Sequence, residues 1–319
     1  MRVAAFGRSK RFLECINNVL ENGHEISLIL TDAHFSNDEN YLEDFFEFAK
    51  IHHIEIYVTN NLSDVHIVQS ILKSNSRIAI SANWKTMVPE QIIEIFPLGV
   101  LNAHSGDLPK YKGNAAVNWA ILNGEKEIAL TIHKMTSRLD EGPIMVKKYF
   151  KIDDSIYFEH VREFIELNLP IAFLEAINLL NRDPYFEINK TDNLEETRGF
   201  SRLPQDGHID WNKSTHHIHK LIRASGYPFQ GAYTFHKNNK VVILRARKEF
   251  PEYTFYGVPG QIASRNSKVG EVKVITADGL IVLEKIRVNK VNYKPSEFLM
   301  TVKDRLGLNL EAIFNKLKN

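Results

Sequence analysis

The feature that most constrains this chain is a regular alternation of short apolar runs and amphipathic stretches through its first hundred residues. Strands that alternate with helices form a parallel sheet with helices on both faces. The pattern therefore predicts an open, Rossmann-like α/β domain. The apolar runs lie at 2–7, 25–31, 54–59, 77–82 and 99–104, and the helical patterns lie at 10–22, 40–52, 64–73 and 89–96.

Beyond this alternation the pattern changes. Residues 114–124 have a helical pattern that ends at Gly124, and residues 128–135 and 142–152 predict two further strands. A long helical stretch runs over 155–180, where Pro170 predicts a kink or a break because proline lacks the N–H that a helix interior needs.

A polar stretch separates two regions of different pattern. Residues 189–207 have no periodicity and predict a linker. A helix at 214–224 and a series of short β-rich runs follow, which predict a small OB-like β-barrel. Two short helices are expected in the tail, at 295–303 and about 309–318. We therefore expect a catalytic domain over 1–188, a linker over 189–207 and a barrel domain over 208–319.

Composition narrows the class of protein. The single Cys15 excludes an internal disulfide framework and Cys-rich zinc or iron–sulfur sites. No apolar run approaches the length of a membrane span, and the N-terminus lacks the apolar segment of a signal peptide. We expect a cytoplasmic enzyme with no membrane partner.

The net charge of +1 conceals an asymmetry. Residues 206–319 hold 19 Lys and Arg against 10 Asp and Glu, whereas residues 1–205 hold 21 against 29. A basic second half favours an anionic partner such as a nucleotide or RNA. A basic surface without a ligand explains the same excess, and both interpretations stay open at this point.

Three side chains have the chemistry of acyl transfer. Asn102 and His104 are two apart on the predicted strand 99–104, so they share one face. Asp140 follows the strand 128–135. An amide donor, a proton carrier and an orienting carboxylate are the groups that acyl transfer needs, and ligands of open sheets bind at the carboxyl ends of the strands. His133, inside an alternating strand, is interpreted as a packed or surface histidine.

These residues lie in motifs that resemble a known family. The chain reads N-A-H-S-G-D-L-P-K-Y-K-G from Asn102, N-W-A-I-L-N-G-E from Asn118, T-I-H-K-M from Thr131 and L-D-E-G-P from Leu139. They resemble the formyltransferases that use 10-formyltetrahydrofolate. RLPQDGHIDW (202–211) and LIRASGYPFQGAYT (221–234) resemble the C-terminal domains of methionyl-tRNA formyltransferase and of sugar N-formyltransferases.

The resemblance implies a role for each residue. Asn102 donates a hydrogen bond to the oxyanion of the reacting formyl group, His104 carries the proton, and Asp140 orients the imidazole. No metal is implied. The folate, as formyl donor, is expected to lie against the following residues: Thr86, Met87, Val88, Asn114, Thr136, Ser137, Arg138, Leu139 and Asp140.

The chain departs from the family at Gly106 and Asp107, where Ser and Leu are usual. Asp107 either binds a polar group of the acceptor or caps the loop. Lys110 and Tyr111, together with Trp84, are further candidates for contacts with the acceptor. For the two aromatic residues, stacking on a ligand and packing in the core are both open.

The charge of one segment in the predicted catalytic domain bears on which acceptor the chain uses. Residues 32–47 are strongly acidic without Lys or Arg, which opposes the binding of RNA near the site. We therefore expect N-formylation of a nucleotide-linked amino sugar, of the 4-amino-4-deoxy type, for lipopolysaccharide or another surface polysaccharide. Methionyl-tRNA formyltransferase is the alternative, and a non-catalytic folate- or nucleotide-binding relative is a third. The sugar enzymes imply a homodimer, and tRNA is not the expected partner.

Four histidines lie close together in HIDWNKSTHHIH (208–219). His216 and His219 share one predicted helix face and have a spacing that allows a metal to bind. We instead predict a solvated helix start with Ser214 as its N-cap.

Overall fold

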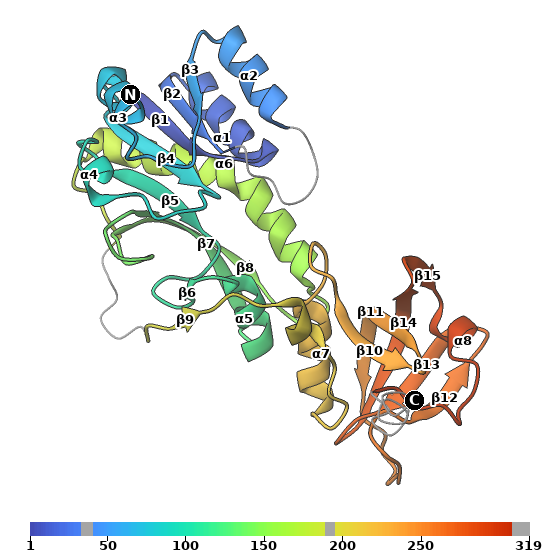
Figure 1. Ribbon diagram of the computed structural model, residues 1–319. Helices are drawn as coiled ribbons and strands as arrows, with labels where there is room; N and C mark the ends of the chain where they lie inside the picture. Colours follow the sequence, from blue (N-terminus) through green and yellow to red (C-terminus); the bar gives the residue numbers. More distant parts are fainter. Residues whose placement is uncertain (33–40, 189–194, 308–319) are drawn as a thin grey trace, which may run out of the picture. The chain divides into compact units, whose positions relative to one another are not determined.

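The computed structural model describes residues 1–32, 41–188 and 195–307, and these divide into two compact units (Figure 1). The first unit holds Met1–Ala116, Glu127–Lys151 and Arg162–Phe200. The second holds Val117–Lys126, Ile152–Val161 and the described residues from Ser201 onward. Two stretches inside the expected first domain, 117–126 and 152–161, therefore group with the second unit. The boundaries at 188 and 208 stay a prediction.

The first unit is built on a seven-stranded sheet in the order β3-β2-β1-β4-β5-β7-β8. The first five strands are parallel, β7 is antiparallel to β5, and β8 is antiparallel to β7. The predicted open parallel α/β sheet is confirmed. The strands are β1 (Arg2–Gly7), β2 (Glu25–Thr31), β3 (Glu55–Val58), β4 (Ile78–Ala82), β5 (Val100–His104), β7 (Glu127–Lys134) and β8 (Ile144–Lys151).

Helices cover both faces of this sheet because its strands are apolar on both sides. In β1, Val3 and Ala5 pack in one core cluster, and Ala4 and Phe6 pack in another. The first cluster includes residues of α1 (Lys10–Glu21), α2 (Tyr41–Ile51) and α6 (Phe158–Arg182), and the second includes residues of α3 (Val65–Ser74) and α4 (Glu90–Ile93). Helix α5 (Ala116–Asn123) follows the loop after β5.

Helix α6 continues through Pro170, so the predicted break does not occur. The flanking residues Leu169, Ala172 and Phe173 are all buried in the first core cluster, which holds both halves of the helix on the sheet. The Pro170 carbonyl also accepts a hydrogen bond from the Asn18 side chain at 3.0 Å. Packing outweighs the local preference of proline here.

The second unit contains the antiparallel sheet that the β-rich runs predicted. Its order is β10-β11-β14-β13-β12, and β15 also pairs with β14. The closure of this sheet into an OB-like barrel stays a prediction. The elements are α7 (Thr215–Ala224), β10 (Ala232–His236), β11 (Asn239–Glu249), β12 (Ile262–Asn266), β13 (Glu271–Ile275), β14 (Leu280–Val288), β15 (Val291–Tyr293) and α8 (Pro295–Phe298).

The histidines of α7 differ from the expectation. Ser214 does cap the helix, because its hydroxyl accepts from the His217 amide at 3.2 Å. His219, however, is only 3% exposed, and its Nε2 donates to the Ala246 carbonyl at 3.1 Å. The interpretation as a solvated residue is therefore wrong for His219, which packs under the sheet. Among the described residues, no three His, Cys, Asp or Glu side chains are placed to hold a metal.

Three other segments also bear on the predictions. The described part of the expected linker forms a two-residue strand, β9 (Arg198–Gly199), and a 3₁₀ turn, Pro204–Gly207. Helix α8 ends at Phe298, earlier than predicted. The helix expected at 309–318 lies outside the described residues, and so do residues 33–40 of the acidic segment 32–47. No helix in the described ranges is both long and apolar enough to cross a membrane.

Candidate active site

The candidate site is built on the pairing of β5 with β7. Asn102 lies directly opposite His133, and His104 lies opposite Thr131. Because side chains of directly opposed residues share one face of an antiparallel pair, these four side chains form one group. The two motifs N-x-H and T-x-H thus meet across one strand pair.

His104 is 7% exposed and has an acceptor at each ring nitrogen. Its Nε2 lies 2.8 Å from the Tyr111 carbonyl oxygen, and its Nδ1 lies 3.4 Å from Oδ2 of Asp140. Burial lowers the pKa of His104, although Asp140 and the Tyr111 carbonyl oppose this shift. A neutral imidazole therefore has one proton for two acceptors, and its other nitrogen can take up a second proton.

Asp140 is also 7% exposed. Burial raises the pKa of this carboxyl group, but the adjacent His133 and His104, each when protonated, and the Gly113 amide together hold the pKa below its ordinary value. The Gly113 N–H donates to Oδ2 at 2.8 Å. Asp140 is thus ionised at neutral pH, beside a neutral His104.

The amide of Asn102 points at a second histidine. Its Nδ2 lies 3.3 Å from Nε2 of His133, and the same His133 nitrogen lies 3.4 Å from Oδ1 of Asp140. Nδ1 of His133 donates to the Lys134 carbonyl at 3.0 Å, so in the neutral ring Nε2 can accept from Asn102 but has no proton to donate to Asp140. His133 therefore lies between the predicted amide and the predicted carboxylate and is bonded to the amide.

The loop after β5 contains the departure from the family motif. A Cβ atom at Gly106 would lie 2.5 Å from Nε2 of His104, so any side chain at this position requires the imidazole to move. Asp107 forms an ion pair with Lys147 of β8 at 2.6 Å, and Lys147 also donates to the Leu108 carbonyl at 2.5 Å. Asp107 thus ties the loop to the sheet through a lysine, and its role toward an acceptor stays a prediction.

The residues expected to contact folate lie in three segments. Thr86 and Met87 are exposed after β4, the neighbour of β5, whereas Val88 is 4% exposed and packs in the core. Asn114 is exposed and adjoins Gly113. The residues between β7 and Asp140 form a turn in which the Arg138 amide donates to the Thr136 hydroxyl at 3.2 Å. Ser137 and Leu139 lie within this turn.

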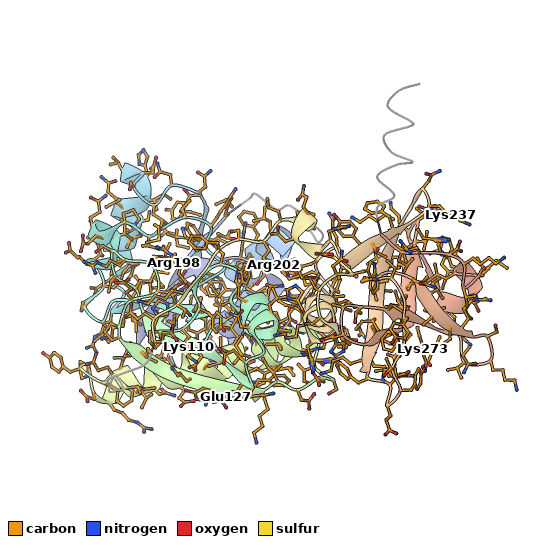
Figure 2. All side chains as sticks on the ribbon, turned by 90° about the horizontal axis from the view of Figure 1, so that it is seen from below. Lys110, Glu127, Arg198, Arg202, Lys237 and Lys273 are labelled. Carbon is orange, nitrogen blue, oxygen red and sulfur yellow. The ribbon has the colours of Figure 1, made fainter. Side chains whose placement is uncertain are left out.

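The residues predicted to contact the acceptor are placed differently. Trp84 packs against Phe6, with ring centroids 6.3 Å apart, which favours the core interpretation. Tyr111 is 7% exposed, so its ring is also largely buried. Lys110, labelled in Figure 2, directly precedes Tyr111 in the loop after β5 and is half-buried.

Four residues of this site were not recognised from the sequence. Thr131 and His133 could have been found from the T-x-H motif, which repeats the spacing of N-x-H on the next strand of the pair. The Thr131 hydroxyl donates to the Gly106 carbonyl at 2.6 Å. Lys147 sits in an ordinary alternating strand. Thr197 lies in the expected linker and accepts a hydrogen bond from the Tyr111 amide at 2.8 Å. Nothing in the sequence pattern marked the last two.

Comparison with known proteins identifies the class. The formyl transferase model matches residues 1–176, and the model of the formyl transferase C-terminal domain matches residues 203–303. The chain belongs to the formyl transferase family.

Individual relatives cover different shares of the chain. The chain is 31% identical over 221 residues to the bifunctional polymyxin resistance protein ArnA of Wigglesworthia glossinidia brevipalpis, an alignment that spans 67% of the chain and 32% of that protein. Among solved structures, WlaRD, a sugar 3N-formyl transferase crystallised with dTDP and 5-N-formyl-THF, shares the fold with a TM-score of 0.64 and 19% identity, over 91% of this chain and 98% of that one.

HypX from Aquifex aeolicus in complex with tetrahydrofolic acid gives a TM-score of 0.59 and 18% identity. That match covers 94% of this chain and 47% of HypX. The chain thus spans about a third of the ArnA protein and about half of HypX.

Proposed function

We propose that this chain transfers the formyl group of 10-formyltetrahydrofolate to the amine of a nucleotide-linked amino sugar. The observation that carries the proposal is the convergence of Asn102, His104 and Asp140 on one strand pair, with His133 between the amide and the carboxylate. We propose Asn102, His104 and Asp140 as the catalytic residues. A cytoplasmic location and a homodimer stay predictions.

The choice of ligands draws on the solved relatives. HypX binds tetrahydrofolic acid, and WlaRD was crystallised with dTDP and 5-N-formyl-THF. The residues of this chain fit such a donor, because a formyl carbon that accepts an amine needs an oxyanion donor and a proton carrier side by side. For the folate itself we propose Thr86, Met87, the backbone at Val88, Asn114 and the turn 136–140.

The amine position is the finer part of the proposal. The expected acceptor is a 4-amino-4-deoxy sugar, whereas WlaRD is a 3N-formyl transferase. Its identity to this chain is 19%, so that likeness concerns the fold. We retain the 4-amino sugar as the expected acceptor, in the synthesis of a surface polysaccharide.

The proposed chemistry follows from the protonation states. The donor supplies an electrophilic formyl carbon. The acceptor amine forms the new C–N bond, the bond from the formyl carbon to N10 of the folate breaks, and the proton lost by the amine ends on N10. His104 is neutral and takes up that proton, because its imidazolium form satisfies both Asp140 and the Tyr111 carbonyl. Asn102 donates to the formyl oxygen as negative charge develops there, an interaction typically worth about 2.7–4 kcal/mol.

His133 is proposed to orient Asn102. Its Nε2 accepts from the amide nitrogen of Asn102, so it fixes which end of that side chain is the donor. Its Nε2 also lies 3.4 Å from Oδ1 of Asp140. His133 is therefore proposed to position Asn102 without a proton transfer of its own.

The test is an acceptor panel. The protein is incubated with 10-formyltetrahydrofolate and, in separate reactions, nucleotide-linked 4-amino sugars, nucleotide-linked 3-amino sugars and methionyl-tRNA, with the formylated product measured by mass spectrometry. We expect formylation of a 4-amino sugar. Turnover of only the 3-amino sugars would show that the formylated amine is the 3-amino group of the sugar. Turnover of only methionyl-tRNA, which the basic second half favours, would replace the proposal.

A further inference from the structure

A short strand from the expected linker lies beside the loop that completes the candidate site. β6 (Lys112–Gly113) pairs in parallel with β9, so that Lys112 is opposite Arg198 and Gly113 is opposite Gly199. Figure 2 labels Arg198 of β9 and Lys110, which lies two residues before β6. More than eighty residues of chain separate the two strands, yet both belong to the first compact unit.

Thr197, directly before β9, holds this loop at two points. Its hydroxyl accepts from the Tyr111 amide at 2.8 Å, and its backbone carbonyl accepts from the Lys112 amide at 2.9 Å. The peptide group between Tyr111 and Lys112 is the one whose carbonyl accepts from His104 at 2.8 Å. A trans peptide is planar, so its N–H and C=O point in opposite directions. The Thr197 carbonyl therefore fixes the direction of the Tyr111 carbonyl through the Lys112 N–H, and the Thr197 hydroxyl fixes the preceding peptide group through the Tyr111 N–H. The two bonds together set the conformation of Tyr111, so that loss of the hydroxyl leaves its carbonyl held on one side only.

Strand β9 also fixes the direction of the backbone N–H that binds Asp140. The Gly113 amide donates to Asp140, and the next amide, Asn114, donates to the Gly199 carbonyl at 3.0 Å. Gly113 has φ +89°, and a Cβ atom there would lie 2.7 Å from the Gly199 carbonyl oxygen. Only glycine allows the two strands to approach this closely, so β9 determines where the Gly113 N–H points.

The loop needs this external support. Tyr111 has φ +58°, in the left-handed region that non-glycine residues rarely adopt. Such a conformation persists where surrounding contacts determine it. Besides the two contacts with Thr197, an ion pair of Lys112 with Glu196, at 2.9 Å, holds the loop to the same segment.

We propose that Thr197 is a positioning residue for formyl transfer, which acts by holding the Tyr111 carbonyl on His104. The inference rests on the proposed role of His104. When His104 takes up a proton, its imidazolium has two acceptors, and Asp140 is anchored by the sheet and by Gly113. The Tyr111 carbonyl, by contrast, lies in a loop whose strand pairing is the short one between β6 and β9. Thr197 therefore governs how well the charged imidazole is stabilised at the moment of proton transfer.

The experiment removes the hydroxyl and compares kcat with KM. Thr197→Val replaces it by a methyl group of similar size, Thr197→Ala removes it without adding an atom, and Thr197→Ser keeps it. The matched control is Thr59→Val. The Thr59 hydroxyl accepts from a backbone amide, that of Asn61, at 3.0 Å, but it lies after β3, four strands from β5. Thermal unfolding of each variant reports on the fold.

We expect Thr197→Val and Thr197→Ala to lower kcat about five- to tenfold, with KM for folate and acceptor within about twofold. Thr197→Ser and Thr59→Val should keep the original kcat. Wild-type kcat in both Val and Ala variants would overturn the inference, as would an equal loss in Thr59→Val. If His104→Gln is inactive while Thr197→Ala is fully active, the proposed function stands and only the inference fails.

Discussion

The two units each contain a buried histidine near an aspartate, and the differences between the two indicate what makes a reactive site. His104 is 7% exposed and lies 3.4 Å from Asp140, and His219 is 3% exposed and lies 3.9 Å from Asp154. Both donate Nε2 to a backbone carbonyl. Burial lowers the pKa of both, to about 4 for His219.

The surroundings of the two histidines differ in charge and in hydrogen bonding. His219 lies beside two cations, Arg223 and Lys248, which lower its pKa further. Beside His104 the corresponding neighbour is His133, which also lowers its pKa, and the strand of His104 carries the amide of Asn102 two residues away. Under the proposed mechanism, a buried His–Asp pair is not by itself sufficient for catalysis, and we expect the neighbouring amide of Asn102 to distinguish His104 from His219.

The strongest way to break this comparison is to make the same change at both positions. His104→Gln keeps a donor but cannot carry a proton, so we expect it to lower kcat about 10²- to 10⁴-fold. His219→Gln should leave kcat within about twofold. Initial rates of formyl transfer, with folate binding measured by fluorescence titration, check both. Near-normal turnover in His104→Gln would remove the proton carrier from the mechanism.

A second paired change tests the carboxylates. Asp140→Asn removes the charge that raises the pKa of His104, and we expect a loss of about 10²-fold in kcat/KM. Because the neutral imidazole is the active form, and its pKa falls further in this variant, the acid limb of the pH–rate profile should move to lower pH. Asp154→Asn should change neither the rate nor the limb. An acid limb that stays in place in Asp140→Asn contradicts the assignment to His104.

The smallest effect concerns stability in acid. The unfolded state binds a proton to His219 near its ordinary pKa of 6.5, whereas the folded state does so only near 4. Stability should therefore be full above pH 6.5 and decrease as the pH falls from 6.5 to 4, by about 3 kcal/mol at most. His219→Gln should flatten this part of the urea-unfolding profile, and exposed His66→Gln should not. Parallel profiles for the two variants would refute the burial argument.

Much of the fold and of the site could be predicted from local pattern. Apolar runs placed β1 to β5 correctly, because most of these strands pack on both faces and the edge strand β3 is partly buried, and spacing placed Asn102 and His104 on one face. The rest depends on contacts between distant segments. The break that Pro170 allowed is absent because tertiary packing holds the helix, and the alternative of a kink stays a prediction. The approach of His133 to Asn102 depends on the register between β5 and β7, which no single strand specifies.

The position of β9 also has a consequence for protein engineering. The two family models match residues 1–176 and 203–303, and Thr197 and Gly199 fall between them. A chimera joined at the ends of those matches, or a catalytic fragment cut at residue 176, would omit or exchange the segment that holds Tyr111 and Gly113 in place. Recombination between members of this family should therefore be made after Phe200, where the first compact unit ends.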